Sequence, residues 1–282
     1  MVQTPWHIEI ANPILAVLMD RLIDFYEPDQ IYIYGSRARG DFHQDSDYDL
    51  MVVVPDSTSA EARHNCYKLK EGLHIAADVK VYTRTCFDEQ LHLKASMPST
   101  VLNEGKLLYS RLGSPPPRML YSPTARSKDW KVSEGDPPAS DPVRLDNTSD
   151  WIQRARADIN AASLLLEQMR LGLSLFHSQQ SVEKALKAFL VWCDQPTARH
   201  HELNLLAIDC QQFDQSLEPY LQSIGWLTEW CVTGRYPLRD PPRPTRILAQ
   251  AGVDSARRVY QAVLERLPQE IIDRLQQTWA YD

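Results

Sequence analysis

Two aspartates, Asp47 and Asp49, stand at the start of the apolar segment YDLMVVV, where a buried strand tolerates carboxylates poorly. Side chains two residues apart on a strand point the same way, so these carboxylates should lie about 7 Å apart on one face. Such charges repel each other unless a cation sits between them. Asp78 stands in a second alternating segment, IAADVKVY, and on neighbouring strands the three carboxylates would converge. A pair of Mg²⁺ ions requires this kind of oxygen ligand set.

A glycine-serine turn precedes the aspartates and predicts an anion cradle. Gly35 lets the backbone approach an anion closely, and Ser36 opens a short helix whose first N–H groups point outward. We expect Arg37, Arg39 and Lys80 to add positive charge for the phosphates of a nucleoside triphosphate. Such a site would catalyse by positioning the substrate and neutralising the charge of its phosphates, and the protein itself would form little or no covalent bond to the substrate.

Simpler readings of the aspartates are weaker. A lone Asp-x-Asp pair most often caps a turn. Asp45, Asp47 and Asp49 also match the start of an EF-hand loop, but Leu50 stands where that loop requires glycine. The combination of a strand, Gly-Ser, Asp-x-Asp and a further strand aspartate favours the metal site.

The elements that must position these residues form a predicted α/β domain over residues 1–110. Apolar periodicities of 3.6 and 2 residues separate its helices from its strands. The expected helices cover 12–26, 58–72 and 86–96, and the expected strands cover 30–35, 48–54 and 74–83, with a last segment at 101–110. This order predicts a small mixed sheet with flanking helices.

The rest of the chain predicts a linker and a helical bundle. Residues 111–149 are rich in proline and serine without apolar periodicity, which is typical of a linker. From 150 to 282 the pattern is helical, and Asp150 with Gln153 has the spacing of a capping box. Glu183 and Lys187 have the spacing of an ion pair on a helix. The expected helices begin near 150 and cover 174–193, 201–213, 217–232 and 245–267, which predicts an all-α bundle.

Composition narrows the classes of protein. The formal charge is −7, and acidic residues outnumber basic ones 16 to 10 over residues 1–110, so direct nucleic-acid binding is not expected. Five cysteines without a CxxC pair indicate reduced thiols. Neither an export signal nor an apolar stretch long enough for a membrane span is evident, so a soluble, cytoplasmic protein is expected.

The first domain resembles a known family. Gly35-Ser36, ten residues, then Asp47-x-Asp49 is the signature pattern of the polymerase-β-type nucleotidyltransferases, and YGSRARGDFHQDSDYDL is especially similar to the minimal nucleotidyltransferases of prokaryotes. The resemblance covers about residues 10–110. It implies transfer of a nucleoside monophosphate from a nucleoside triphosphate such as ATP, with pyrophosphate release. It also implies Mg²⁺, in two ions, held by Asp47, Asp49 and Asp78 as the catalytic residues, and phosphates held at Gly35 and Ser36.

The helical half resembles the HEPN domain through RARADINAASLLLE, LFHSQQSVEKALKAFLVW and RHHELNLL, over about residues 150–268. Members that cleave RNA carry an arginine followed within a few residues by histidine. Arg235 lacks that histidine, so ribonuclease activity is not expected. His177, His200 and His201 remain, and a lone helix histidine is more often a packing or surface residue. Gln180 and Lys184 share a polar face with His177.

The leading expectation from both resemblances is a toxin–antitoxin-like fusion that moves AMP from ATP to a protein tyrosine or another hydroxyl acceptor. Tyr236, beside Arg235, is a candidate acceptor for self-modification. One alternative is a transferase acting on a small molecule of the aminoglycoside type, and another is a regulatory nucleotide-binding module without turnover. The sequence leaves open the acceptor, the base of the nucleotide and whether the bundle forms a homo-oligomer.

Overall fold

The computed structural model describes residues 12–43, 46–118, 141–196, 201–233 and 243–278. The chain divides into two compact units, Met1–Thr124 and Ala125–Asp282. Among the described helices, none combines the length and apolar character that a transmembrane segment needs.

The first unit is built on the small mixed sheet that the sequence predicts. Strands β1 (Gln30–Tyr34), β2 (Tyr48–Val54), β3 (Ala77–Thr83) and β4 (Lys106–Ser110) lie in the order β3-β2-β1-β4. Strand β1 pairs antiparallel with β2 and β4, whereas β2 and β3 are parallel. A parallel pair needs a long crossover, and the chain between β2 and β3 supplies it.

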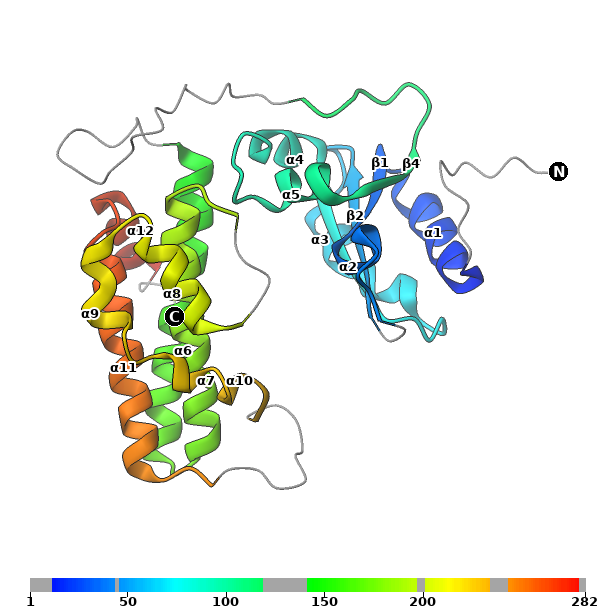
Figure 1. Cartoon of the computed structure of the whole chain (residues 1–282). Helices are drawn as coiled ribbons and strands as arrows, with labels where there is room; N and C mark the ends of the chain where they lie inside the picture. Colours follow the sequence, from blue (N-terminus) through cyan, green and yellow to red (C-terminus); the bar gives the residue numbers. More distant parts are fainter. Residues whose placement is uncertain (1–11, 44–45, 119–140, 197–200, 234–242, 279–282) are drawn as a thin grey trace. The chain divides into compact units, whose positions relative to one another are not determined.

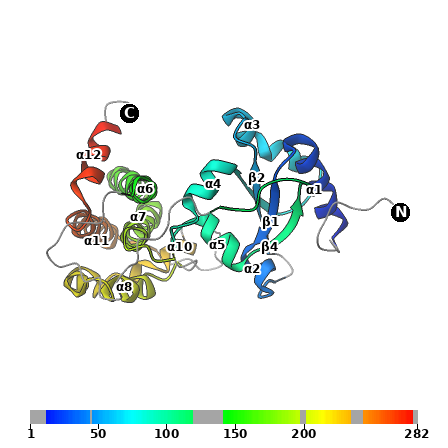
Figure 2. The same cartoon turned by 90° about the horizontal axis from the view of Figure 1, so that it is seen from above.

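Helices cover both faces of this sheet (Figures 1 and 2). Helix α1 (Pro13–Tyr26), capped by Asn12, packs on one face, while α4 (Arg84–Gln90) and α5 (Met97–Glu104) pack on the other. The strands alternate accordingly. Leu50, Val52, Val54, Ala77 and Val79 join the core under α1, and Met51 and Val53 join the core under α4 and α5.

Two predicted helices of this unit are shorter than expected. The predicted helix at 58–72 is α3 (Ala60–His64) followed by a 3₁₀ helix over Asn65–Lys70. The predicted helix at 86–96 is α4, which ends at Gln90, and the chain then turns until the Ser96 side chain caps the next helix, α5. The segment predicted at 101–110 is divided between α5 and β4.

A buried ionic network ties the start of the predicted linker to the first unit. Arg84, which is buried, lies 3.3 Å from Asp29 and 3.4 Å from Asp88. Arg111 also pairs with Asp29, and the backbone N–H of Arg118 donates to Asp88 at 3.2 Å. The described part of the segment after residue 110 is therefore anchored to the first unit rather than forming a free connection.

The second unit is the predicted bundle. Its helices are α6 (Pro142–Glu167), α7 (Leu171–Trp192), α8 (Leu203–Gln211), α9 (Glu218–Leu221), α10 (Trp230–Thr233), α11 (Arg246–Leu264) and α12 (Gln269–Thr278), with 3₁₀ turns at Gln215–Leu217 and Gly225–Leu227. Figure 2 views α6, α7 and α11 nearly end-on, side by side. Helix α7 lies at the centre and packs against α6, α8, α10 and α11, which explains why most of its residues are buried.

The start of the bundle was predicted too late. Helix α6 begins at Pro142, and the Asp141 side chain accepts hydrogen bonds from the N–H groups of Val143 and Arg144. The capping box expected at Asp150 does not form there, because Asp150 lies inside α6. An aspartate N-cap followed by proline in the first turn is a strong signal for the start of a helix. The proline- and serine-rich composition of the surrounding segment outweighed this signal in the prediction.

The single helix predicted at 217–232 is also wrong. The chain forms four short pieces there, from Gln215 to Thr233. Pro219 stands in the first turn of α9, where it cannot extend a preceding helix. Gly225 packs so closely on Asn204 that an added Cβ would lie 2.2 Å from the amide oxygen. Packing against α8 therefore breaks the helical periodicity.

Candidate active site

Strand register brings two of the predicted aspartates together. Asp49 on β2 lies directly beside Asp78 on the parallel strand β3. Neighbouring strands are about 4.8 Å apart, and residues in register on a parallel pair share a face. This is the face that carries Met51 and Val53. Asp47 is exposed and stands one residue before β2 begins, so all three carboxylates belong to this end of the two strands.

Gly35 packs against the Asp49 carboxylate. The end of β1 is paired in register with Asp49, and the chain turns from there into the short helix α2 (Gly35–Arg39). Gly35 has φ +75°, and an added Cβ would lie 2.0 Å from Asp49 Oδ2. Both the left-handed backbone and the close approach therefore require glycine. Ser36 follows at the half-buried start of α2, the short helix that the sequence predicts, and anion binding there stays a prediction.

Lys80 lies on the same strand as Asp78, two residues further on. Its ammonium lies 2.7 Å from Asp78 Oδ2, and the Asp78 side chain remains 51% exposed. An exposed ion pair of this kind is worth about 0–1 kcal/mol, so it is easily exchanged for another cation or for a phosphate partner. The structure thus places Lys80 beside the carboxylates, as expected.

Arg37 has a role that the sequence did not indicate. Its guanidinium lies 4.0 Å from the centre of the Tyr48 ring and 5.0 Å from that of Phe42, and its Nε donates to the Ser46 carbonyl at 2.8 Å. These contacts hold the turn that carries Asp47 against α2. The aromatic residues on either side of the charged loop were the available signal.

Arg39 is engaged as well. It lies 3.2 Å from both Asp41 and Glu104. Glu104 ends α5, so this pair connects α2 with the helix next to β4. Phosphate binding by Arg39 stays a prediction that requires the exchange of these exposed pairs.

The donor atoms at this end of the sheet fit Mg²⁺. Asp47, Asp49 and Asp78 offer carboxylate oxygens, the hard ligands that Mg²⁺ prefers, and two of the three are fixed by strand register. The Gly35 backbone is held against one of these carboxylates. The arrangement therefore brings carboxylates that could hold metal ions and backbone N–H groups that could hold phosphate to one place.

The helical unit contains two further clusters of charged residues along α7. Asp158 on α6 lies 2.8 Å from the His177 imidazole and also pairs with Lys184. Glu183 and Lys187 form the predicted ion pair at 2.8 Å, but both side chains are buried rather than solvated. His201 Nδ1 lies 3.0 Å from Glu183. His177 and His201 are thus both bound by carboxylates.

Burial and charge act in opposite directions on Glu183. Burial raises the pKa of this carboxyl, but the Lys187 ammonium, the Gln179 amide and the nearby His201 outweigh burial and hold its pKa below the ordinary value. Glu183 is therefore ionised at neutral pH. Three other predicted residues, His200, Arg235 and Tyr236, lie outside the described residues.

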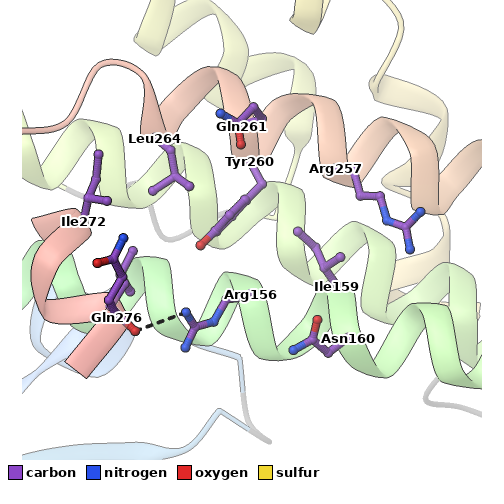
Figure 3. Close-up of a pocket in the computed structure, with 10 residues that line it drawn as sticks. Arg156, Ile159, Asn160, Arg257, Tyr260, Gln261, Leu264, Ile272 and Gln276 are labelled. Carbon is purple, nitrogen blue, oxygen red and sulfur yellow. Dashed lines mark hydrogen bonds between the residues drawn. The ribbon is translucent and has the colours of Figure 1, made fainter. Parts of the chain in front are cut away.

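A pocket of about 400 Å³ opens between α6, α11 and α12 (Figure 3). Its walls include Ile159, Leu264 and Ile272, with the Tyr260 ring between them. Arg156 donates to the Leu275 carbonyl at 3.4 Å, which links α6 to α12. Burial raises the pKa of Tyr260, although Arg156 opposes this, so the phenol is neutral. The pocket is mainly apolar and belongs to the packing of the bundle.

Comparison with known proteins agrees with this architecture. The family model described as "Polymerase beta, Nucleotidyltransferase" matches residues 18–112, and the "HEPN domain" model matches residues 148–267. No curated protein shows significant similarity to the chain. One solved structure, the crystal structure of TT1696 from Thermus thermophilus, is 26% identical over 43% of this chain and 98% of that chain, with a TM-score of 0.39.

A second solved structure, "Crystal structure of the toxin-antitoxin with AMP-PNP", is 24% identical over 34% of this chain and 73% of that chain, with a TM-score of 0.26. Each compact unit contains the match of one family model, and the order of the two domains is that of the predicted fusion. The chain therefore joins a polymerase-β-type nucleotidyltransferase domain to a HEPN domain.

Proposed function

We propose that the first domain transfers a nucleoside monophosphate, AMP from ATP, to a hydroxyl acceptor with release of pyrophosphate. One observation carries the proposal: Asp49 and Asp78 lie in register on neighbouring strands, with the Gly35 backbone against the Asp49 carboxylate. Like charges held side by side cost stability, and a cation between them removes the cost. The match to the nucleotidyltransferase model supports the same chemistry.

The protein's own groups would bind and orient the substrate. The N–H groups at the start of α2 and the Ser36 hydroxyl donate to phosphate oxygens, with Lys80 adding charge. Bound at Asp47, Asp49 and Asp78, two Mg²⁺ ions would neutralise the phosphates and lower the pKa of the attacking hydroxyl. Asp78 would accept the proton of that hydroxyl. The site works by holding the α-phosphorus in line between acceptor and leaving group.

The acceptor we propose is a protein tyrosine or another hydroxyl, in a toxin–antitoxin-like module formed with the HEPN domain. The pairing of the two domain types on one chain supports this extension. Tyr236 is the candidate for self-modification. Mass spectrometry after incubation with ATP and Mg²⁺ tests it: we expect AMP on Tyr236 and its loss in Tyr236→Phe. AMP on a supplied aminoglycoside instead would identify a small-molecule transferase.

Pyrophosphate release tests the transferase itself. We expect Mg²⁺-dependent release from one of four nucleoside triphosphates, and its loss in Asp49→Asn. Asp24→Asn is the matched control, because Asp24 is an exposed aspartate on α1 of the same unit. Nucleotide binding without pyrophosphate release, with protein, RNA and small-molecule acceptors all supplied, would instead identify a regulatory binding module.

A further inference from the structure

Helix α7 of the HEPN domain buries an unusual number of polar side chains. Four of them, Gln179, Gln180, Glu183 and Lys187, are at most 8% exposed. Burying such groups costs free energy unless each one is bound. Their hydrogen bonds converge: Gln179 and Lys187 both donate to the Glu183 carboxylate, at 3.0 and 2.8 Å. The carboxylate is thereby fixed in one orientation.

Two further groups reach the same carboxylate from distant parts of the chain. His201 stands two residues before α8, and Cys231 stands on α10. One ligand atom from each of Glu183, His201 and Cys231 lies within 4.8 Å of the others. His201 Nδ1 is 3.0 Å from both carboxylate oxygens. An oxygen, a nitrogen and a sulfur ligand thus surround one point.

This mixed set is typical of Zn²⁺, which binds thiolate, imidazole and carboxylate in tetrahedral geometry. Tetrahedral bonds of the usual lengths separate neighbouring ligand atoms by about 3.3–3.6 Å. The ligand atoms of Glu183, His201 and Cys231 lie between 3.0 and 4.8 Å apart, which spans this range. The His201 side chain is 52% exposed and has room to adjust. We propose that Glu183, His201 and Cys231 form a Zn²⁺ site that ties α7, the residues before α8 and α10 together.

The neighbours of the three ligands act as a supporting shell. Lys187 and Gln179 orient Glu183, and the Lys187 ammonium also lies 5.8 Å from the centre of the Trp151 ring. Gln180 donates to Gln179 at 2.7 Å and lies 4.0 Å from Cys231 Sγ. Partners that fix the orientation of metal ligands are a regular feature of zinc sites.

Charge and protons balance when the ion binds. The ion lies between His201 Nδ1 and the Glu183 carboxylate, with neutral imidazole as ligand, and the Cys231 thiol loses its proton to solvent. Carboxylate and thiolate then neutralise Zn²⁺, while Lys187 keeps its pairing with the carboxylate. The exposed side of His201 leaves the fourth position to water, as in sites with three protein ligands.

Cobalt spectroscopy on the full chain tests the site, because thiolate bound to Co²⁺ gives a near-ultraviolet charge-transfer band that carboxylate ligands do not give. We expect one band-forming equivalent of Co²⁺, displaced by Zn²⁺. The band should vanish in Cys231→Ser and persist in Cys193→Ser, a buried cysteine of the same unit. His201→Gln should weaken binding at least about tenfold. A band that survives in Cys231→Ser, or no band in the wild type, overturns the proposal.

X-ray absorption of wild-type protein with one equivalent of Zn²⁺ gives an answer that does not depend on how a variant folds. The expected shell has one sulfur at about 2.3 Å and lighter atoms at about 2.0–2.2 Å. A shell of oxygens alone would place the ion at the aspartates of the first domain and overturn the proposal.

Discussion

In the sheet of the nucleotidyltransferase domain, Asp49 lies in register with Asp78, whereas in the HEPN domain Glu183 lies against Lys187. The first pair brings like charges together at the half-exposed ends of two strands. The second pair is buried, and each charge meets an opposite one. Both pairs lie on regular elements that hold the side chains in place.

The difference separates two uses of a carboxylate. Like charges held beside each other repel, and the exposed Lys80–Asp78 pair offsets this repulsion only weakly, so such an arrangement indicates a ligand that compensates the carboxylates. A buried ion pair instead stabilises little beyond apolar packing, but it is costly to break because one charge is then left buried. Substitutions at the two places should therefore affect different properties.

The largest expected effect is on activity at the first site. Asp49→Asn should lower nucleotidyl transfer by more than about a hundredfold, because removal of even an outer partner of a metal site costs about 10- to 100-fold. Stability should stay within about 0.5 kcal/mol, since a repulsion is removed from a half-exposed position. Pyrophosphate release and urea unfolding measure the two properties. An Asp49→Asn variant that is strongly destabilised but still active would show that Asp49 serves stability and not catalysis.

The reverse pattern is expected in the HEPN domain. Glu183→Ala leaves the Lys187 ammonium buried and unpaired, which should destabilise this domain by about 3–5 kcal/mol. Tryptophan fluorescence in urea measures it, because the tryptophans among the described residues lie in this domain, namely Trp151, Trp192, Trp226 and Trp230. Pyrophosphate release by the first domain should not change in Glu183→Ala, because Glu183 is not part of the nucleotidyltransferase site.

The double variant Glu183→Leu/Lys187→Met is the control for that experiment. With a chelator present, so that bound Zn²⁺ does not contribute, this variant removes both charges and keeps apolar volume, and its free energy of unfolding should return close to the wild-type value. A double variant as unstable as Glu183→Ala would show that volume, and not the unpaired ammonium, sets the loss.

Substitution of Gly35 should lower both stability and activity, and its effect on stability should be smaller than that of Glu183→Ala. Gly35→Ala forces a Cβ against Asp49 Oδ2 at 2.0 Å and strains a backbone with φ +75°. Gly72→Ala is matched, since Gly72 has the same φ but open space around it. Both variants should lose about 1–2 kcal/mol through the backbone, and only Gly35→Ala should also lose pyrophosphate release. Equal activities would place Gly35 outside the site.

Local signals explain what the sequence could predict. The alternation in YDLMVVV predicts β2 with its observed bounds, and the same period places Asp49 and Asp78 on one face once their strands are neighbours. Lys80 follows from this period too. The burial of Glu183 and Lys187 could not be seen, because an i, i+4 pair of charges is usually solvated and only the packing of α7 among its neighbours reverses that.

Long-range contacts explain what the sequence missed. The stacking of Arg37 on Phe42 and Tyr48 depends on the shape of a loop, and the break at Gly225 depends on Asn204. The start of α6 was missed for a different reason. Asp141-Pro142 is a clear local signal, but it lies in a segment whose overall composition indicates a linker.

The smallest expected effect is a difference in acid sensitivity between wild type and Glu183→Leu/Lys187→Met. The folded pKa of Glu183 lies below its ordinary value of 4.5, since Lys187, Gln179 and His201 outweigh burial. A lowered folded pKa gives stability that is fully present above the unfolded pKa and is lost as the pH falls through the folded one. As the pH falls below about 5, the HEPN domain of the metal-free wild type should therefore lose more stability than that of the double variant. Urea unfolding followed by tryptophan fluorescence at each pH measures this difference. Parallel pH profiles of the two proteins would mean that Glu183 is protonated as easily in the folded domain as in the unfolded chain. The contacts of Glu183 with Lys187 and Gln179 argue against that outcome.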